Sequence, residues 1–107
     1  MKDEFLEHLL SIIKSKKDEN PKVSYTAMLQ QEDIIETLKK IEEEAFEVIE
    51  AAKLKNKNDI IHEIADLWFH CLVLLAKKDI TVAEITAELQ KRQGVSGIKE
   101  KLNRVKK

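Results

Sequence analysis

Apolar residues recur along most of this chain at spacings of three and four, the period of an amphipathic α-helix. The first such segment predicts a helix over Asp3 to Lys16, and a polar stretch ending in Pro21 interrupts the pattern after it. Next, Ser24 is predicted to cap a short helical turn. A second long helix is predicted over Ile34 to Leu54, with one apolar stripe made of Ile34, Leu38, Ile41, Ala45, Val48 and Ala52.

The segment from Asp59 to Lys78 differs from these, because apolar residues cover every side of it. A helix that is apolar all round is normally buried, and a short chain offers few neighbours to bury it. We therefore expect an all-α helical bundle in which this helix forms a dimer interface. Asn58 is predicted to cap it. Thr81 followed by Glu84 has the pattern of a capping box and predicts a fourth helix ending near Lys91.

Composition agrees with a helical protein and narrows the function. The chain has 107 residues, which suits a single domain over 1–107, and holds only two glycines and one proline. A net charge of -1 gives no support to nucleic-acid binding. The most apolar segment is interrupted by His62, Glu63 and Asp66, which argues against a membrane span. Since Cys71 has no partner for a disulfide and no signal peptide is visible, we expect a cytoplasmic protein.

Two groups of acidic residues carry the candidate chemistry, Glu43-Glu44-x-x-Glu47 and Glu63-x-x-Asp66. Residues three apart lie on one face of a helix, so two packed antiparallel helices could bring these carboxylates together. The negative charges of such a cluster repel one another unless a cation or protons neutralise them. Carboxylate oxygens are ligands that suit Mg²⁺ or Mn²⁺.

A more ordinary interpretation exists for each group. Acidic pairs on exposed helices are usually solvated, and Glu63 and Asp66 could form ion pairs with lysines. His70, one turn beyond Asp66, is either a core histidine or a group that orients a carboxylate.

Taken together, the two acidic groups resemble the signature of the MazG-like nucleotide pyrophosphohydrolases. Three further stretches resemble the phosphoribosyl-ATP pyrophosphatase family within it. They are Ser24-Tyr25-Thr26-Ala27, the segment from Ala65 to Leu75, and Glu88-Leu89-x-x-Arg92-x-Gly94-Val95-Ser96-Gly97 with Glu100-Lys101. The chain departs from the family pattern at Glu42, where a glycine is usual, and at Met28, where a basic residue is common.

The resemblance implies an enzyme that hydrolyses phosphoribosyl-ATP to phosphoribosyl-AMP and pyrophosphate, the second step of histidine biosynthesis. It implies an all-α, MazG-like helical bundle completed by homodimerisation, and Mg²⁺ as the cofactor. The oxygen ligands leave Mn²⁺ possible as well. The implied metal ligands are Glu44, Glu47, Glu63 and Asp66, with Glu43 near the site. Our mechanistic hypothesis is that a catalytic carboxylate, Glu43 or Glu44, accepts a proton from the attacking water. The positions implied to surround the substrate are Ser24, Tyr25, Lys40, Arg92, Ser96 and Lys101.

Two other functions fit parts of the sequence. A house-cleaning pyrophosphohydrolase of (deoxy)nucleoside triphosphates would share the acidic groups but would have a different base pocket. A non-catalytic helical interaction module would leave its carboxylates solvated and would bind no metal.

Overall fold

The computed structural model describes residues 2–54 and 56–93. Within these residues the chain forms five α-helices and no β-strand, which confirms the all-α prediction. The helices are α1 (Lys2–Ser15), α2 (Tyr25–Gln31), α3 (Ile34–Leu54), α4 (Lys57–Lys78) and α5 (Val82–Arg92). The predicted bounds of α3 agree with those observed, and those of α1 and α5 differ from them by one residue.

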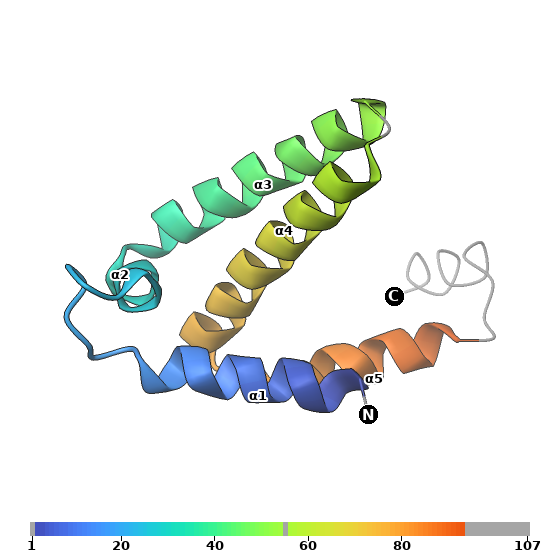
Figure 1. The fold of residues 1–107 in the computed structure, drawn as a ribbon. Coiled ribbons are helices and arrows are strands. Elements are labelled where there is room, and N and C mark those ends of the chain that lie inside the picture. Colours follow the sequence, from blue (N-terminus) through green and yellow to red (C-terminus); the bar gives the residue numbers. More distant parts are fainter. Residues whose placement is uncertain (1, 55, 94–107) are drawn as a thin grey trace.

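The long helices α3 and α4 form an antiparallel pair and pack against each other more extensively than any other two helices (Figure 1). Helix α1 packs across the C-terminal end of α4, and α5 packs against α1. The short α2 lies beside α4, close to the start of α3. The α3–α4 pair is therefore the frame on which both acidic groups are carried.

The main apolar core lies where α1, α2, α4 and the start of α5 meet. Its buried members are Leu10, Ile13, Leu29, Leu72, Val73 and Val82. Met28, one of the two departures from the family pattern, packs against this core. A thioether in this position adds apolar contacts that a basic side chain would not supply.

Side-chain caps fix where three helices begin. The Ser24 hydroxyl accepts a hydrogen bond from the amide of Ala27 at 3.1 Å, as predicted. The predicted capping box of α5 is also present, with the Glu84 amide donating to the Thr81 hydroxyl at 3.1 Å. Helix α4 is capped by Asn56, and the prediction of Asn58 is wrong. The Asn56 carboxamide oxygen accepts from the Asp59 amide at 3.2 Å, so the helix starts two residues earlier than expected.

The structure also corrects the predicted burial of the long helices. Leu38 is 49% exposed and Ala52 is exposed, so neither belongs to the buried side of α3. That side is centred on Thr37 and Ala51. The buried Thr37 hydroxyl accepts a hydrogen bond from the ammonium group of Lys77 on α4, which offsets the cost of burying it.

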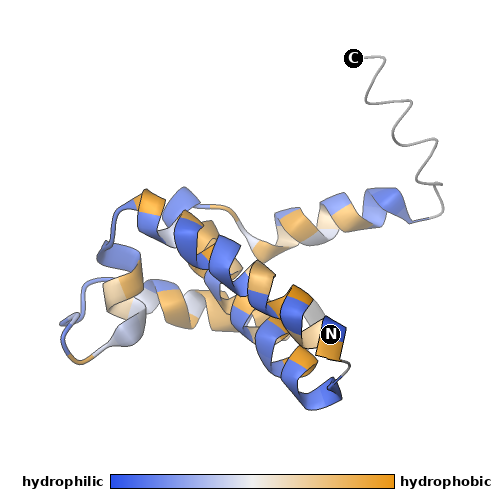
Figure 2. Cartoon of the chain, turned by 90° about the horizontal axis from the view of Figure 1, so that it is seen from above, coloured by the Kyte–Doolittle hydropathy of each residue, from blue (hydrophilic) through white to orange (hydrophobic). Residues whose placement is uncertain are grey.

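Helix α4 is not buried on every side within one chain. Ile61 is 57% exposed and Trp68 is 56% exposed, whereas Leu72 and Val73 are buried. Helix α3 covers one side of α4, and α1 adds cover only toward the end of α4. Apolar segments alternate with polar ones along each long helix (Figure 2), and several of these apolar residues, among them Ile61 and Trp68, are exposed. No helix in the described part of the chain is both long and apolar enough to cross a membrane.

The α5 capping box gives a testable prediction about stability. We expect Thr81→Ala to lower the free energy of unfolding by about 1 kcal/mol, because the Glu84 amide loses its acceptor. Thr81→Ser, which keeps a hydroxyl, should stay close to the parent. Urea unfolding of the three proteins measures the difference, and equal midpoints for Thr81→Ala and the parent would contradict the capping assignment.

The same box predicts a pH dependence. Hydrogen bonds from the amide and hydroxyl of Thr81 lower the pKa of Glu84 in the folded protein. The stabilisation by this carboxylate is therefore complete above its unfolded pKa and disappears as the pH falls through the lowered folded pKa. Glu84→Ala should be less stable than the parent at pH 7, and the gap should close in acid. A gap that stays constant across the titration would rule out this contribution.

Candidate metal centre

The structure brings the two acidic groups together across the α3–α4 pair. Glu44 on α3 is half-buried, and burial is the first cause that raises its pKa. The negative charges of Asp66 and Glu63 on α4 raise this pKa further, followed by those of Glu47 and Glu43 on its own helix. Because charges act in this way only at short range, the carboxylates of both helices share one region.

Within residues 2–54 and 56–93, the carboxylates of this region have no lysine or arginine partner. The lysines of α3 that form ion pairs, Lys39 and Lys53, pair with Glu36 and Glu50 instead. The ion pairs with lysine considered for Glu63 and Asp66 are therefore not formed by any lysine that the structure describes. Such a concentration of acidic groups favours protons or a bound cation.

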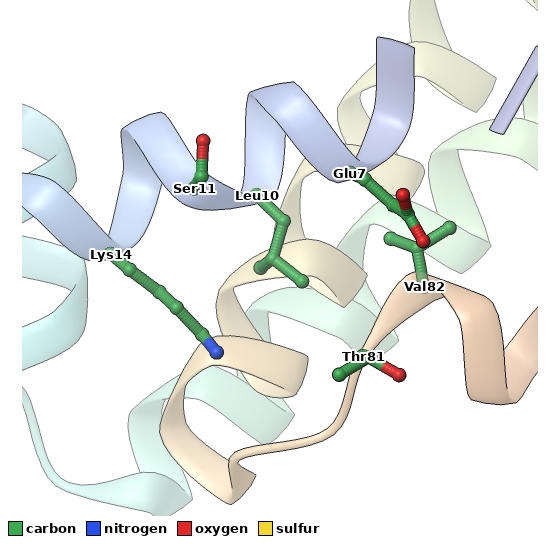
Figure 3. Close-up of a pocket in the computed structure, with 6 residues that line it drawn as sticks. All are labelled: Glu7, Leu10, Ser11, Lys14, Thr81 and Val82. Atoms are coloured by element: carbon green, nitrogen blue, oxygen red, sulfur yellow. The ribbon is translucent and has the colours of Figure 1, made fainter. Parts of the chain in front are cut away.

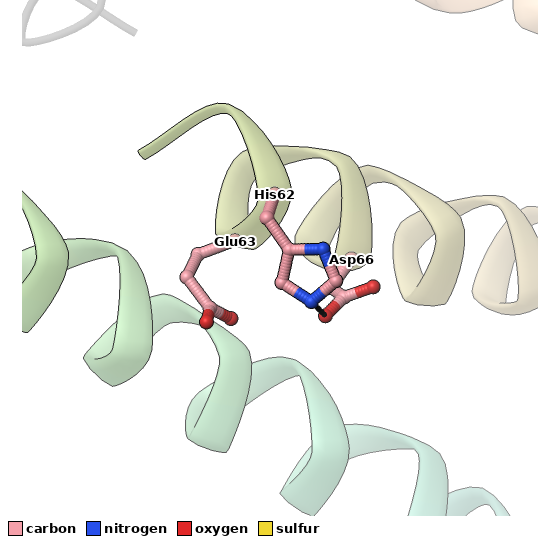
Figure 4. Close-up of side chains that lie close together, drawn as sticks. All are labelled: His62, Glu63 and Asp66. Carbon is pink, nitrogen blue, oxygen red and sulfur yellow. Dashed lines mark ion pairs between the residues drawn. The ribbon is translucent and has the colours of Figure 1, made fainter. Parts of the chain in front are cut away.

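Sequence reasoning missed one member of this region, His62. Its Nε2 atom lies 3.3 Å from Oδ2 of Asp66, one helical turn further along α4. With Glu63, these residues offer one nitrogen and two oxygen donor atoms that all lie within 4.8 Å of one another (Figure 4). The spacing of four residues between His62 and Asp66 was the available sequence signal.

His70 is buried behind the carboxylates. Its pKa is lowered by burial and then by the positive charge of Lys40, while Asp66, Glu32 and Glu43 act in the opposite direction. The neutral imidazole is thus favoured. Lys40 and Asp66 both lie within electrostatic range of His70, so the structure places Lys40 in the neighbourhood of the acidic region.

The other residues implied to surround the substrate are more scattered. Ser24 caps α2, and Tyr25 begins that helix with a side chain that is 54% exposed. Arg92 lies at the end of α5 and pairs with Glu88 of the same helix at 3.4 Å. Helix α5 packs against α1 and projects away from the α3–α4 pair (Figures 1 and 2), so the structure does not bring Arg92 to the carboxylates. Ser96 and Lys101 lie outside the described residues.

A hollow of about 200 Å³ lies between α1 and the start of α5. Its lining residues are Glu7, Leu10, Ser11, Lys14, Thr81 and Val82 (Figure 3). None of them belongs to the acidic region or to the residues implied to surround the substrate. We therefore place the candidate functional site at the carboxylates and not in this hollow.

Crowding of the carboxylates predicts a gain of stability when one charge is removed. Because the folded pKa of Glu44 is raised, the unfolded protein releases this proton first as the pH rises. Stability is then lost between the unfolded and the folded pKa and stays reduced above them. In metal-free buffer at pH 7, Glu44→Gln should therefore melt at or above the temperature of the parent. A clearly lower melting temperature would show that the Glu44 charge stabilises the metal-free fold.

The fold and this region define an all-helical protein with a centre of carboxylates between two antiparallel helices. The chain matches the family described as phosphoribosyl-ATP pyrophosphohydrolase over residues 6–93. It therefore belongs to that family.

Curated relatives match along nearly the whole chain. A phosphoribosyl-ATP pyrophosphatase of Nitrosomonas eutropha is 48% identical over 92% of this chain and 85% of the relative. One of Vesicomyosocius okutanii is 50% identical over 95% of this chain and 97% of the relative. One of Hydrogenovibrio crunogenus is 43% identical over 99% of this chain and 97% of the relative.

Proposed function

We propose that this protein hydrolyses phosphoribosyl-ATP to phosphoribosyl-AMP and pyrophosphate, the second step of histidine biosynthesis. Membership of the phosphoribosyl-ATP pyrophosphohydrolase family and relatives of that name along almost the full chain support this substrate. The structural observation that carries the proposal is the convergence of carboxylates from α3 and α4 around Glu44. A triphosphate substrate is itself strongly anionic, so it would need a cation to approach such a region.

We further propose Mg²⁺ as the cofactor, with Mn²⁺ as a substitute. The residues fit a hard divalent ion, because they offer several carboxylate oxygens with no lysine or arginine paired to them in the described chain. Glu44, Glu47, Glu63 and Asp66 would hold the ion. When bound, it would neutralise the phosphate charge and make a water molecule more acidic.

The protein's own groups would position the substrate and handle the proton. Glu43, exposed beside Glu44, would accept the proton of the attacking water, with Glu44 as the alternative acceptor. Lys40 would contact the phosphates from the same helix, one turn before Glu44. Ser24, Tyr25, Ser96 and Lys101 would surround the remainder of the substrate, whereas Arg92 lies away from the carboxylates within one chain and is given no role there. No covalent intermediate is required, since water is the nucleophile.

We also propose a homodimer in the cytoplasm. The support for a dimer is the number of large apolar side chains that one chain leaves exposed on α3 and α4, among them Phe46, Ile49, Ile61 and Trp68. Exposed apolar groups of this extent usually mark an interface. A role in amino-acid biosynthesis supports the cytoplasmic location, where the free thiol of Cys71 would stay reduced.

Product analysis tests the proposed activity. The purified protein is incubated with phosphoribosyl-ATP and Mg²⁺, and pyrophosphate and orthophosphate are measured separately. We expect pyrophosphate and phosphoribosyl-AMP in equal amounts, with no turnover in excess chelator. Orthophosphate as the first product would contradict the reaction. Faster hydrolysis of deoxynucleoside triphosphates in the same panel would favour a house-cleaning role instead.

A further inference from the structure

His62 shares a corner of the acidic region with Glu63 and Asp66, and all three side chains come from the first half of α4. Figure 4 shows them projecting from the same side of that helix. The closest contact is the 3.3 Å between His62 Nε2 and Asp66 Oδ2. An ordinary surface ion pair could account for this contact alone, but it contributes little to stability. With the Glu63 carboxylate, the pair becomes a group of three donor atoms that could hold a metal ion.

The spacing of the three donor atoms suits a single small cation. All of them lie within 4.8 Å of one another. Around an ion with ligands at about 2.1 Å, neighbouring donors lie about 3 Å apart and opposite donors about 4 Å apart. Small side-chain rotations would therefore let His62, Glu63 and Asp66 bind one ion together. His62 and Glu63 are adjacent on α4 and Asp66 lies one turn further along, so one rigid helix carries all three side chains.

The chemistry of the three donors differs from that of an all-carboxylate site. Imidazole nitrogen adds affinity for divalent transition metals, whereas Mg²⁺ gains little from it. We propose that His62 is a direct ligand, with Glu63 and Asp66, of a divalent transition-metal ion in the site where the carboxylates would also hold Mg²⁺. This inference rests on the proposed function, because Glu63 and Asp66 belong to the proposed metal site. It adds a residue and a metal preference to that site.

Two measurements that do not use catalysis test the ligand. The first is electron spin-echo spectroscopy of the Mn²⁺-loaded protein, which detects a histidine nitrogen bound directly to the ion. The second is calorimetric titration with Co²⁺ and with Mg²⁺. The variants are His62→Gln and, as a matched control, His8→Gln, since His8 is an exposed histidine on α1.

We expect nitrogen modulation in the parent and in His8→Gln, and none in His62→Gln. His62→Gln should weaken Co²⁺ binding at least about tenfold and change Mg²⁺ binding less than about twofold. Mn²⁺ that binds the parent without nitrogen modulation, or modulation that persists in His62→Gln, would overturn the assignment of His62 and leave the carboxylate site standing. A parent that binds no Mn²⁺ would overturn both proposals.

Discussion

Asp66→Asn is expected to lower the rate of pyrophosphate release by about 10²- to 10³-fold while the protein remains folded. The substitution keeps the size of the side chain but removes the charge that acts on Glu44 from the facing helix. It also weakens the contact with His62, which is exposed and contributes little to stability. Steady-state kinetics with saturating Mg²⁺ measures the rate, and thermal melting checks the fold.

Asp59→Asn is the matched control for this experiment. Asp59 lies on α4 as well, in its first turn, and its side chain is exposed. It has no part in the proposed site, so its variant should keep the activity of the parent. If Asp66→Asn kept full activity, or if both variants lost the same amount, the proposed role of Asp66 would be wrong.

The second large effect concerns an apolar stripe on the outer side of α3. Its exposed members are Ile35, Leu38, Phe46 and Ile49. These positions recur at helical spacing and point away from the side of α3 that Thr37 and Ala51 bury. A helix with apolar residues on two opposite sides normally packs against two neighbours, and one chain provides only α4.

We expect Phe46→Glu to dissociate the proposed dimer. A charge placed in an apolar interface should raise the dissociation constant by roughly 30- to 1000-fold, which corresponds to about 2–4 kcal/mol. Sedimentation equilibrium of the parent and the variant measures this change. Val23→Glu serves as the control, because Val23 is 83% exposed in the connection between α1 and α2. A parent that sediments as a monomer at all concentrations would exclude the dimer, and an unaffected variant would exclude this stripe as its interface.

The helices themselves were predictable because local rules decide them. The spacing of apolar residues defined α3, and side-chain caps at Ser24 and Thr81 fixed the starts of α2 and α5. The start of α4 was less determined, because Asn56 and Asn58 are equally good caps in sequence. In the structure α4 begins at Lys57, with Asn56 as its cap.

Burial was harder to predict than helix formation. The apolar stripe of α3 was assigned to include Leu38 and Ala52, yet the packed side is rotated toward Thr37 and Ala51. Part of the reason is Lys77, whose ammonium group donates to the Thr37 hydroxyl and to the Glu32 carbonyl oxygen. A polar contact between residues so far apart in sequence has no local signature. It nevertheless sets which residues of α3 face α4.

In the candidate site, too, the helix face could be predicted but the side-chain contacts could not. Spacing placed Glu63 with Asp66 on one face, and the electrostatic environment of Glu44 agrees with the expected convergence across α3 and α4. The contact of His62 with Asp66 depends on side-chain orientation and was missed. The expected position of Arg92 near the substrate came from resemblance alone, and in a single chain its helix projects elsewhere.

The central claim is that carboxylates from both α3 and α4 hold one divalent centre. Anomalous diffraction from crystals soaked in Mn²⁺ and pyrophosphate tests it most directly. The account predicts a manganese peak within coordination distance of Glu44 or Glu47 on α3 and of Glu63 or Asp66 on α4. A peak bound by one helix alone, or no peak at these residues, would contradict it.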